Sequence, residues 1–187
     1  TGKSILIMGR PGIGKTTIVA EGAARAGVAL HLGRPTHFGG DTIPLAPLAD
    51  LLRQVRRTAP DLLIDMATLT GSARVALGPD LPPFYTNDEK LAGDVTRHSQ
   101  TQKDPLWRMP FWDPYCSLFE SPVADLNNSA DTSFAGSITA ALFLKRFVEN
   151  AKSYLHLDIY GWTPTAKPGF PKGGEAQATA TVLHGRH

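Results

Sequence analysis

Cysteine is almost absent from this chain, and so are other marks of exported proteins. Cys116 is the single cysteine among 187 residues, so no disulfide forms within the chain. No basic start followed by a long apolar stretch marks a secretory signal, and the lack of disulfides is typical of a reducing compartment. We therefore expect a cytoplasmic protein in which Cys116 packs against its neighbours and does not act as a nucleophile.

Long apolar runs are missing as well. No segment approaches the roughly 20 apolar residues that cross a bilayer, so we expect no membrane partner. Aromatic side chains do not alternate with basic ones as they do in nucleic-acid grooves, so we expect no nucleic-acid partner. The hydrophobic content of 42% and the charged content of 19% are ordinary for a globular protein with a substantial core.

Charge is distributed unevenly along the chain, although the net charge is only +2. Residues 1–60 carry eight Lys or Arg against three Asp or Glu, whereas residues 61–187 carry eleven against fourteen. A basic N-terminal part favours an anionic ligand there.

A glycine-rich loop occupies this basic part. Residues 9–16 match the phosphate-binding pattern G-x-x-x-x-G-K-[ST] at every fixed position. The apolar run Ile5–Met8 predicts a buried strand before the loop, and residues 17–26 predict a helix after it. The predicted nucleotide-binding residues are Gly9, Gly12, Gly14, Lys15, Thr16 and Thr17.

The residue types in this loop suit phosphate chemistry. Glycines let successive backbone N–H groups turn toward phosphate oxygens, and the helix N-terminus adds its own free N–H groups. Lys15 reaches the β- and γ-phosphates, and the Thr16 hydroxyl binds Mg²⁺. The loop predicts ATP or GTP with Mg²⁺, and Asp65, which follows the apolar run Leu62–Ile64, is the candidate second Mg²⁺ ligand. No residue is assigned to hydrolysis.

Apolar periodicity beyond the loop predicts alternating helices and strands. Strands are expected at 28–32, 62–64 and 155–160, and helices at 47–57, 71–77, 88–98 with Asn87 as N-cap, and 137–148. Residues 79–86, 125–136 and 163–175 are expected to be loops. Residues 103–114 are expected to be irregular and packed, anchored by Trp107 and Trp112.

Two family resemblances meet in this chain. Residues 1–56 resemble the nucleotide-binding start of bacterial signal-transduction ATPases, through the loop at 9–16, Leu32–Arg34 and Gly39–Leu48. Residues 60–182 resemble the C-terminal part of the leucyl aminopeptidases, also called cytosol aminopeptidases. The matching stretches are 60–71, 104–110, 121–128, 134–144 and 156–160.

The aminopeptidase resemblance implies peptide-bond hydrolysis at a two-metal site, with Zn²⁺ or Mn²⁺, in a homo-oligomer. It places Leu69, Thr70 and Gly71 on a loop that contacts the peptide, and residues 134–138 near the side-chain pocket. It aligns Asp41 with one metal ligand, but Ile43 and Leu45 stand where a Glu ligand and an Arg belong. The metal site implied by the resemblance is therefore incomplete.

The fold class we expect is α/β, a three-layer sandwich with a mostly parallel sheet and a phosphate loop in its N-terminal strand–loop–helix unit. Residues 1–56 form the nucleotide-binding segment and residues 57–187 the aminopeptidase-like segment, merged into one domain of an apparent chimera. The function predicted first is binding of ATP or GTP phosphates. The alternatives are a metal-dependent leucyl aminopeptidase and a non-catalytic chimeric or assembly protein.

Overall fold

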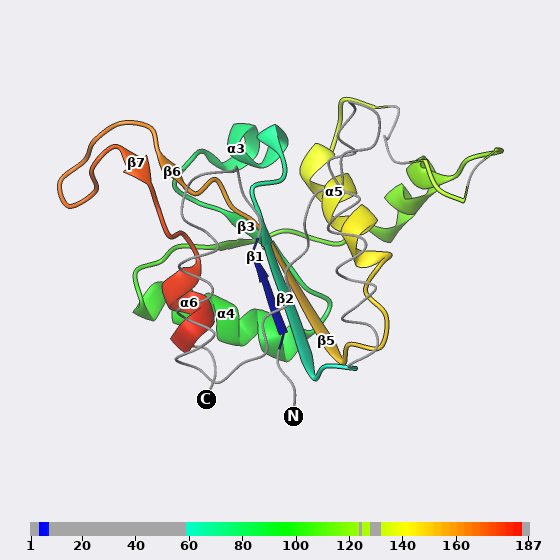
Figure 1. The fold of residues 1–187 in the computed structure, drawn as a ribbon, viewed down its shortest axis with the longest axis horizontal. Coiled ribbons are helices and arrows are strands. Elements are labelled where there is room, and N and C mark those ends of the chain that lie inside the picture. The colour runs from blue at the N-terminus through cyan, green and yellow to red at the C-terminus, as the bar shows by residue number, and fades with distance from the viewer. Residues whose placement is uncertain (1–3, 8–58, 124, 128–131, 185–187) are drawn as a thin grey trace, which may run out of the picture.

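A five-stranded sheet lies at the centre of the fold (Figure 1). The computed structural model describes residues 4–7, 59–123, 125–127 and 132–184. The strands, which lie in the order β1-β2-β5-β3-β4, are β1 (Ser4–Ile7), β2 (Leu62–Ala67), β3 (Pro83–Tyr85), β4 (Trp107–Arg108) and β5 (Ser153–Asp158). Only the β3–β5 pair is antiparallel among these strands, so the predicted mixed α/β fold with a mostly parallel sheet is confirmed.

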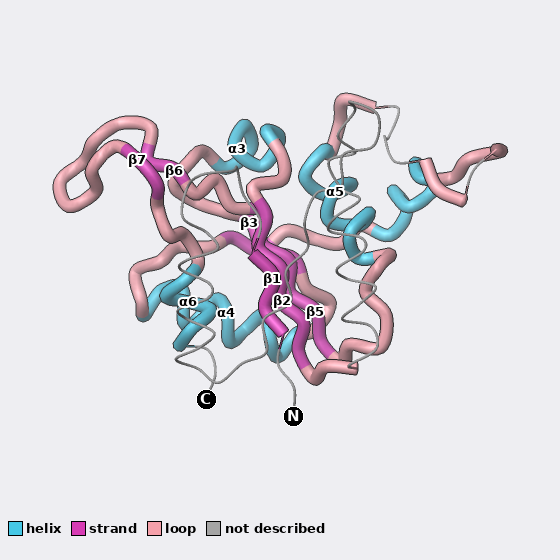
Figure 2. The backbone as a smooth tube through the Cα atoms, viewed as in Figure 1, coloured by secondary structure: helices cyan, strands magenta, loops and turns pink. Residues whose placement is uncertain are grey.

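Helices cover both faces of this sheet (Figure 1). One face packs against α4 (Glu89–Thr101) and α6 (Thr179–His184), and the other against α5 (Gly136–Lys145) and the 3₁₀-helix η2 (Asp113–Phe119). Helix α3 (Gly71–Leu77) follows β2 after the short segment 68–70, and the hairpin of β6 (Trp162–Thr163) and β7 (Gly173–Gly174) projects to one side (Figure 2).

The face under α4 and α6 packs through an apolar core, and Ser99 of α4 and Thr181 of α6 are buried there as well. Alternate residues of the central strands, among them Ile64, Met66 and Leu157, pack against Val95 of α4 and Val182 of α6. Burial of such side chains stabilises the fold by about 1.5–3 kcal/mol each, which anchors the two helices to the sheet.

The face under α5 and η2 is half apolar and half polar. Leu63 packs there with Leu142 and Leu144 of α5 and with Phe119 of η2. The next residue of β2 on this face is Asp65, and the opposing residues of β5 are His156 and Asp158, all three at 2% exposure or less. Buried polar groups are costly unless they are hydrogen-bonded, so the polar part of this face requires the network of bonds described below.

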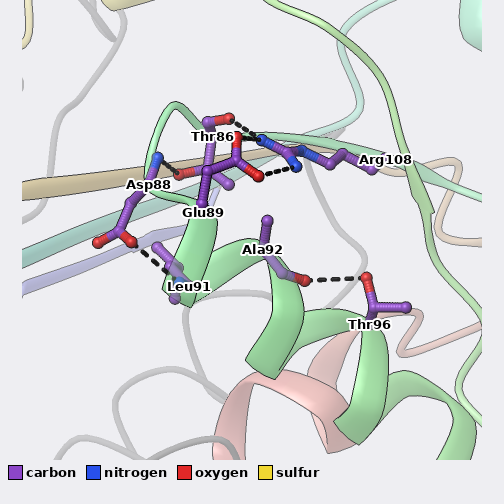
Figure 3. Close-up of polar contacts among 7 residues, drawn as sticks. All are labelled: Thr86, Asp88, Glu89, Leu91, Ala92, Thr96 and Arg108. Atoms are coloured by element: carbon purple, nitrogen blue, oxygen red, sulfur yellow. Dashed lines mark hydrogen bonds and ion pairs between the residues drawn. The ribbon is translucent and has the colours of Figure 1, made fainter.

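Helix α4 begins at a dense set of polar contacts (Figure 3). Asp88 is the N-cap, one residue after the predicted Asn87, and its Oδ1 accepts a hydrogen bond from the Leu91 N–H at 3.0 Å. Arg108 of β4 donates to both carboxylate oxygens of Glu89, at 2.6 and 2.7 Å. The start of α4 is thereby tied to the edge strand of the sheet.

The expected elements differ from the observed ones in several places. The predicted loop 79–86 contains β3, and the strand predicted at 155–160 spans Ser153–Asp158. The tail predicted at 163–175 forms most of the β6–β7 hairpin. Trp107 and Trp112 were predicted to be packed anchors, which is wrong, because their exposed fractions are 56% and 53%.

Most of the N-terminal predictions lie outside the described residues. Strand β1 confirms a strand just before the glycine loop and pairs in parallel with β2. The loop at 9–16, the helix expected after it and the helix at 47–57 are not described. Among the helices that are described, none combines the length and apolarity of a membrane span.

Candidate functional site

The carboxyl ends of β2 and β5 lie side by side, because the two strands pair in parallel with Ala67 opposite Asp158. The chain leaves β2 through residues 68–71, which we call the β2 loop. Asp158 Oδ1 accepts hydrogen bonds from the Leu69 N–H at 3.0 Å and the Thr70 N–H at 3.1 Å. Asp158 Oδ2 accepts from the Thr70 hydroxyl at 2.6 Å, so one carboxylate holds two successive residues of the loop.

The β2 loop covers this carboxylate. Asp158 is 2% exposed, whereas Thr68, Leu69 and Thr70 are half-buried and Gly71 is exposed. One side of the loop therefore faces the core, and its other side lies at the surface. Ligands of open α/β sheets bind at this carboxyl edge, which makes the β2 loop the candidate site.

The start of α5 meets the β2 loop and α3. Ser137 Oγ lies 3.3 Å from Asp158 Oδ2, so the same carboxylate contacts both segments. A Cβ placed on Gly136 would lie 2.4 Å from Ser72 Oγ, so a larger residue here would force the Ser72 side chain to move. Ala135 precedes it in the left-handed region, with φ of 54°.

A second group of polar side chains lies further along the same face of the sheet. His156 Nδ1 lies 2.6 Å from Asp65 Oδ1, and the Tyr154 hydroxyl donates to Asp65 Oδ2 at 2.5 Å. Asp65 and His156 are fully buried. In the described part of the chain, His156 Nε2 has no hydrogen-bond partner.

The charges in this group shift the titration of their neighbours. Burial by itself lowers the pKa of His156, but Asp65 and, more weakly, Asp158 bring this pKa above its ordinary value of 6.5. Burial and the adjacent Asp65 carboxylate raise the pKa of Tyr154 well above its usual range. The imidazole is thus biased toward the charged form, and the phenol stays neutral and donates to Asp65.

Tyr85 connects the two parts of this polar face. It lies opposite His156 in the β3–β5 pair, and its hydroxyl is 2.5 Å from Ser137 Oγ. Burial raises the pKa of Tyr85 to about 12, the Ser137 hydrogen bond opposes this rise, and Asp158 adds to it. The phenol therefore stays protonated and bonds with the hydroxyl that also contacts Asp158.

Asp65 differs from the prediction made for it. It lies inside β2 and not at the end of the strand, because the strand extends to Ala67. Both of its carboxylate oxygens have protein partners, His156 and Tyr154. Across the described ranges, no group of three His, Cys, Asp or Glu side chains is arranged to hold a metal ion. None of the described side chains is therefore assigned to a metal.

The structure brings together only part of the predicted site. Leu69, Thr70 and Gly71 lie beside the start of α5, the segment that the resemblance puts near the side-chain pocket. The predicted nucleotide residues at 9–17 and the weak metal candidate Asp41 lie outside the described residues.

The sequence also contains a signal for Asp158. A carboxylate at the end of an apolar strand was the reason to single out Asp65 in β2. Asp158 ends β5 in the same way and, unlike Asp65, does reach the carboxyl edge of the sheet. Ser137 and Tyr85 carry no such signal, because only tertiary packing brings them to Asp158.

The fold and site define an α/β protein with its candidate site at the carboxyl edge of a mostly parallel sheet. Residues 47–183 match the cytosol aminopeptidase family, catalytic domain. This chain belongs to the cytosol aminopeptidase family. The match confirms the longer of the two resemblances, and membership implies a metal cofactor for the family's chemistry.

Individual relatives agree with this assignment. A probable cytosol aminopeptidase of Chloroherpeton thalassium is 45% identical over 133 residues, which cover 71% of this chain and 25% of the relative. One of Legionella pneumophila is 46% identical over 114 residues, covering 61% of this chain and 23% of the relative. The chain thus spans about a quarter of the length of the curated relatives it matches.

Solved structures show the same likeness in three dimensions. The cytosol aminopeptidase of Coxiella burnetii has a TM-score of 0.70 at 47% identity, over 74% of this chain and 30% of that chain. A variant of tomato leucine aminopeptidase has a TM-score of 0.64 at 34% identity, over 74% of this chain and 27% of that chain.

The comparisons overturn the function predicted first. Binding of ATP or GTP phosphates with Mg²⁺ is wrong as the function of this chain, because the family match and these relatives are aminopeptidases. The prediction of a chimera has no support either. A glycine loop followed by Lys-Thr is a short pattern, and its meaning depends on the domain around it. The predictions of ATP binding and of a nucleotide-binding phosphate loop are corrected with it.

Proposed function

We propose that this chain takes part in metal-dependent release of N-terminal amino acids from peptides, as a leucyl aminopeptidase. The observation that carries the proposal is the β2 loop, held at the carboxyl edge of the sheet by Asp158 with its other side at the surface. In this proposal Leu69, Thr70 and Gly71 face the peptide, and residues 134–138 at the start of α5 lie beside it.

The metal ion, Zn²⁺ or Mn²⁺, is not held by the described side chains in this proposal. Asp65 and Asp158 are the two fully buried carboxylates near the site, and each has all its oxygens hydrogen-bonded to protein groups. The described segment contributes the loop and the sheet beneath it, and Asp41 remains a predicted ligand. Residues 57–187 remain the proposed aminopeptidase-like segment, and a cytoplasmic location remains a prediction.

The direct test is hydrolysis of L-leucyl-p-nitroanilide by the full chain with Zn²⁺ or Mn²⁺ added. We expect p-nitroaniline release that a chelator abolishes and that Asp41→Ala lowers. Folded chain that binds the metal but releases no p-nitroaniline would contradict the proposal.

A second candidate is a non-catalytic assembly protein that keeps the substrate-facing loop. It is favoured by the lack of a metal-holding group in the described part of the chain and by Ile43 and Leu45 at positions where the resemblance requires Glu and Arg. Sizing chromatography of the full chain distinguishes the two. A stable homo-oligomer without hydrolysis supports the assembly protein, and an active chain of any size excludes it.

A further inference from the structure

We propose that Asp158 is the positioning residue of the β2 loop: its carboxylate sets which side of the loop faces a substrate. The inference rests on the proposed function, because that function is what assigns the loop to a peptide. The juxtaposition itself, a buried carboxylate at the end of β5 under two successive loop amides, stands on the geometry alone.

The Asp158 carboxylate is buried and accepts hydrogen bonds at both of its oxygens. Its two oxygens take four hydrogen bonds, two from backbone N–H groups and two from the hydroxyls of Thr70 and Ser137. A carboxylate in the core is costly unless donors offset the loss of water, and charge-assisted bonds are the stronger ones. The loop amides therefore donate two of the four hydrogen bonds that compensate the burial of this carboxylate. The carboxylate in turn holds the loop in place.

These bonds fix the orientation of two peptide planes. The described peptide bonds are all trans, so each C=O points opposite to the N–H of the same plane. With the N–H groups of Leu69 and Thr70 on Asp158, the carbonyl oxygens of Thr68 and Leu69 point away from it. Rotation of either plane would turn a carbonyl oxygen toward the carboxylate, which repels it.

The same carboxylate orients the Thr70 side chain. The Thr70 hydroxyl gives its proton to Asp158 Oδ2, and its oxygen accepts the Ala73 N–H at 3.1 Å as the N-cap of α3. Loss of Asp158 would free the hydroxyl to rotate, so the loop and the first turn of α3 would loosen together.

Asp104 provides a matched control. Its carboxylate also accepts two backbone amides, from Ala178 at 2.8 Å and Thr181 at 3.1 Å. These bonds hold the start of α6 on the opposite face of the sheet. Asp104→Ala therefore removes the same kind of contact without touching the β2 loop.

The test measures amide hydrogen exchange in the full chain for Asp158→Ala, Asp158→Asn and Asp104→Ala. We expect Asp158→Ala to speed exchange of the Leu69 and Thr70 amides by about tenfold or more, the effect of losing a buried hydrogen-bond partner. Asp158→Asn keeps one acceptor oxygen and should restore part of the protection. Asp104→Ala should affect the Ala178 and Thr181 amides and leave the loop unchanged.

Kinetics on L-leucyl-p-nitroanilide separate positioning from stability. We expect Asp158→Asn to raise KM by about tenfold with a smaller change in kcat, while Asp104→Ala leaves KM unchanged. If Asp158→Ala does not fold, Asp158→Asn and Thr70→Val are compared with Asp104→Ala in its place. If the wild-type chain shows no hydrolysis, the proposed function is wrong. The exchange experiment then still tests whether Asp158 holds the β2 loop.

Two results would overturn the proposal. One is equal loss of protection at Leu69 and Thr70 in the Asp158 and Asp104 variants, which would mean that general destabilisation is the cause. The other is an unchanged exchange rate of both amides in Asp158→Ala, which would mean that the carboxylate does not hold the loop.

Discussion

At the scale of single residues, the polar face under α5 combines two buried carboxylates with different tasks. Asp158 contacts the loop and the start of α5, whereas Asp65 bonds to His156 and Tyr154 within the core. Removing a partner of either buried carboxylate, a histidine for Asp65 or a neutral donor for Asp158, leaves a charge without compensation, so both groups are sensitive positions. The groups around His156 are Asp65, Tyr154, Asp158 and Tyr85.

The pKa of His156 predicts how stability depends on pH. Because its folded pKa lies above the unfolded value of 6.5, the folded state binds the proton more tightly. Its contribution to stability is fully present below pH 6.5 and is lost as pH rises through the folded pKa. Each pKa unit of difference corresponds to about 1.4 kcal/mol.

Urea denaturation of the wild type and of His156→Gln between pH 5.5 and 9 measures this contribution. We expect the free energy of unfolding of the wild type to fall with rising pH above 6.5, and this slope to be absent from the variant. Parallel curves for the two proteins would show that His156 is neutral in the fold, with Asp65 paired to an uncharged imidazole.

The sequence pattern pointed to Asp65 but not to the roles of Asp158 and Ser137. Asp65 was singled out because it follows three apolar residues, and it proved to be a core group. Asp158 and Ser137 stand within longer stretches that resemble the aminopeptidases, and no local pattern assigns either of them a role. Hydrogen bonds between residues 21 to 89 positions apart decide the site, and periodicity carries no information on such pairs.

At the scale of elements, α4 was predicted well because its start has a local cause. Asp88 caps the helix through the Leu91 N–H, and its Oδ2 accepts the Ser153 hydroxyl at 2.5 Å. These two bonds, the Ser153 bond first, lower the pKa of Asp88, so its carboxylate is charged at neutral pH. The cap therefore also joins α4 to the start of β5.

Asp88→Ala should destabilise the protein by about 1 kcal/mol, the usual effect of losing an N-cap. Asp88→Asn should recover most of this loss, since an amide oxygen also caps a helix. Ser153→Ala is the matched control, because it removes the contact with β5 and keeps the cap. Thermal or urea denaturation measures all three, and equal losses for Asp88→Ala and Asp88→Asn would contradict capping as the cause.

The short strands were missed for a physical reason. Pro82 and Pro83 precede or begin β3, and proline within a run argues against a strand. Its pairing with the central strand β5 supplies what the local sequence does not. Trp107 lies on the two-residue strand β4, the last strand in the order of the described sheet, and both residues of this strand are exposed.

At the scale of the whole molecule, the predicted α/β fold with a mostly parallel sheet is confirmed, the phosphate loop lies outside the described residues, and the function predicted first is wrong. The sheet and its two helical layers follow from apolar residues on both faces of the central strands, such as Leu63 on one face and Ile64 on the other. The nucleotide interpretation rested on the loop at 9–16 with its flanking segments and on a resemblance limited to residues 1–56, whereas the family match covers residues 47–183. A long match that covers several elements constrains function more than a short loop, because it specifies the surroundings of the site.

The measurement we would make first is a titration of the ¹⁵N-labelled full chain with L-leucinamide and Zn²⁺, followed through the backbone amide signals. If the β2 loop faces the peptide, the largest shifts will fall on Leu69, Thr70 and Gly71 and on the start of α5 near Ser137. Shifts confined to other parts of the chain, or no shifts at saturating metal and ligand, would contradict the assignment of this loop to the substrate.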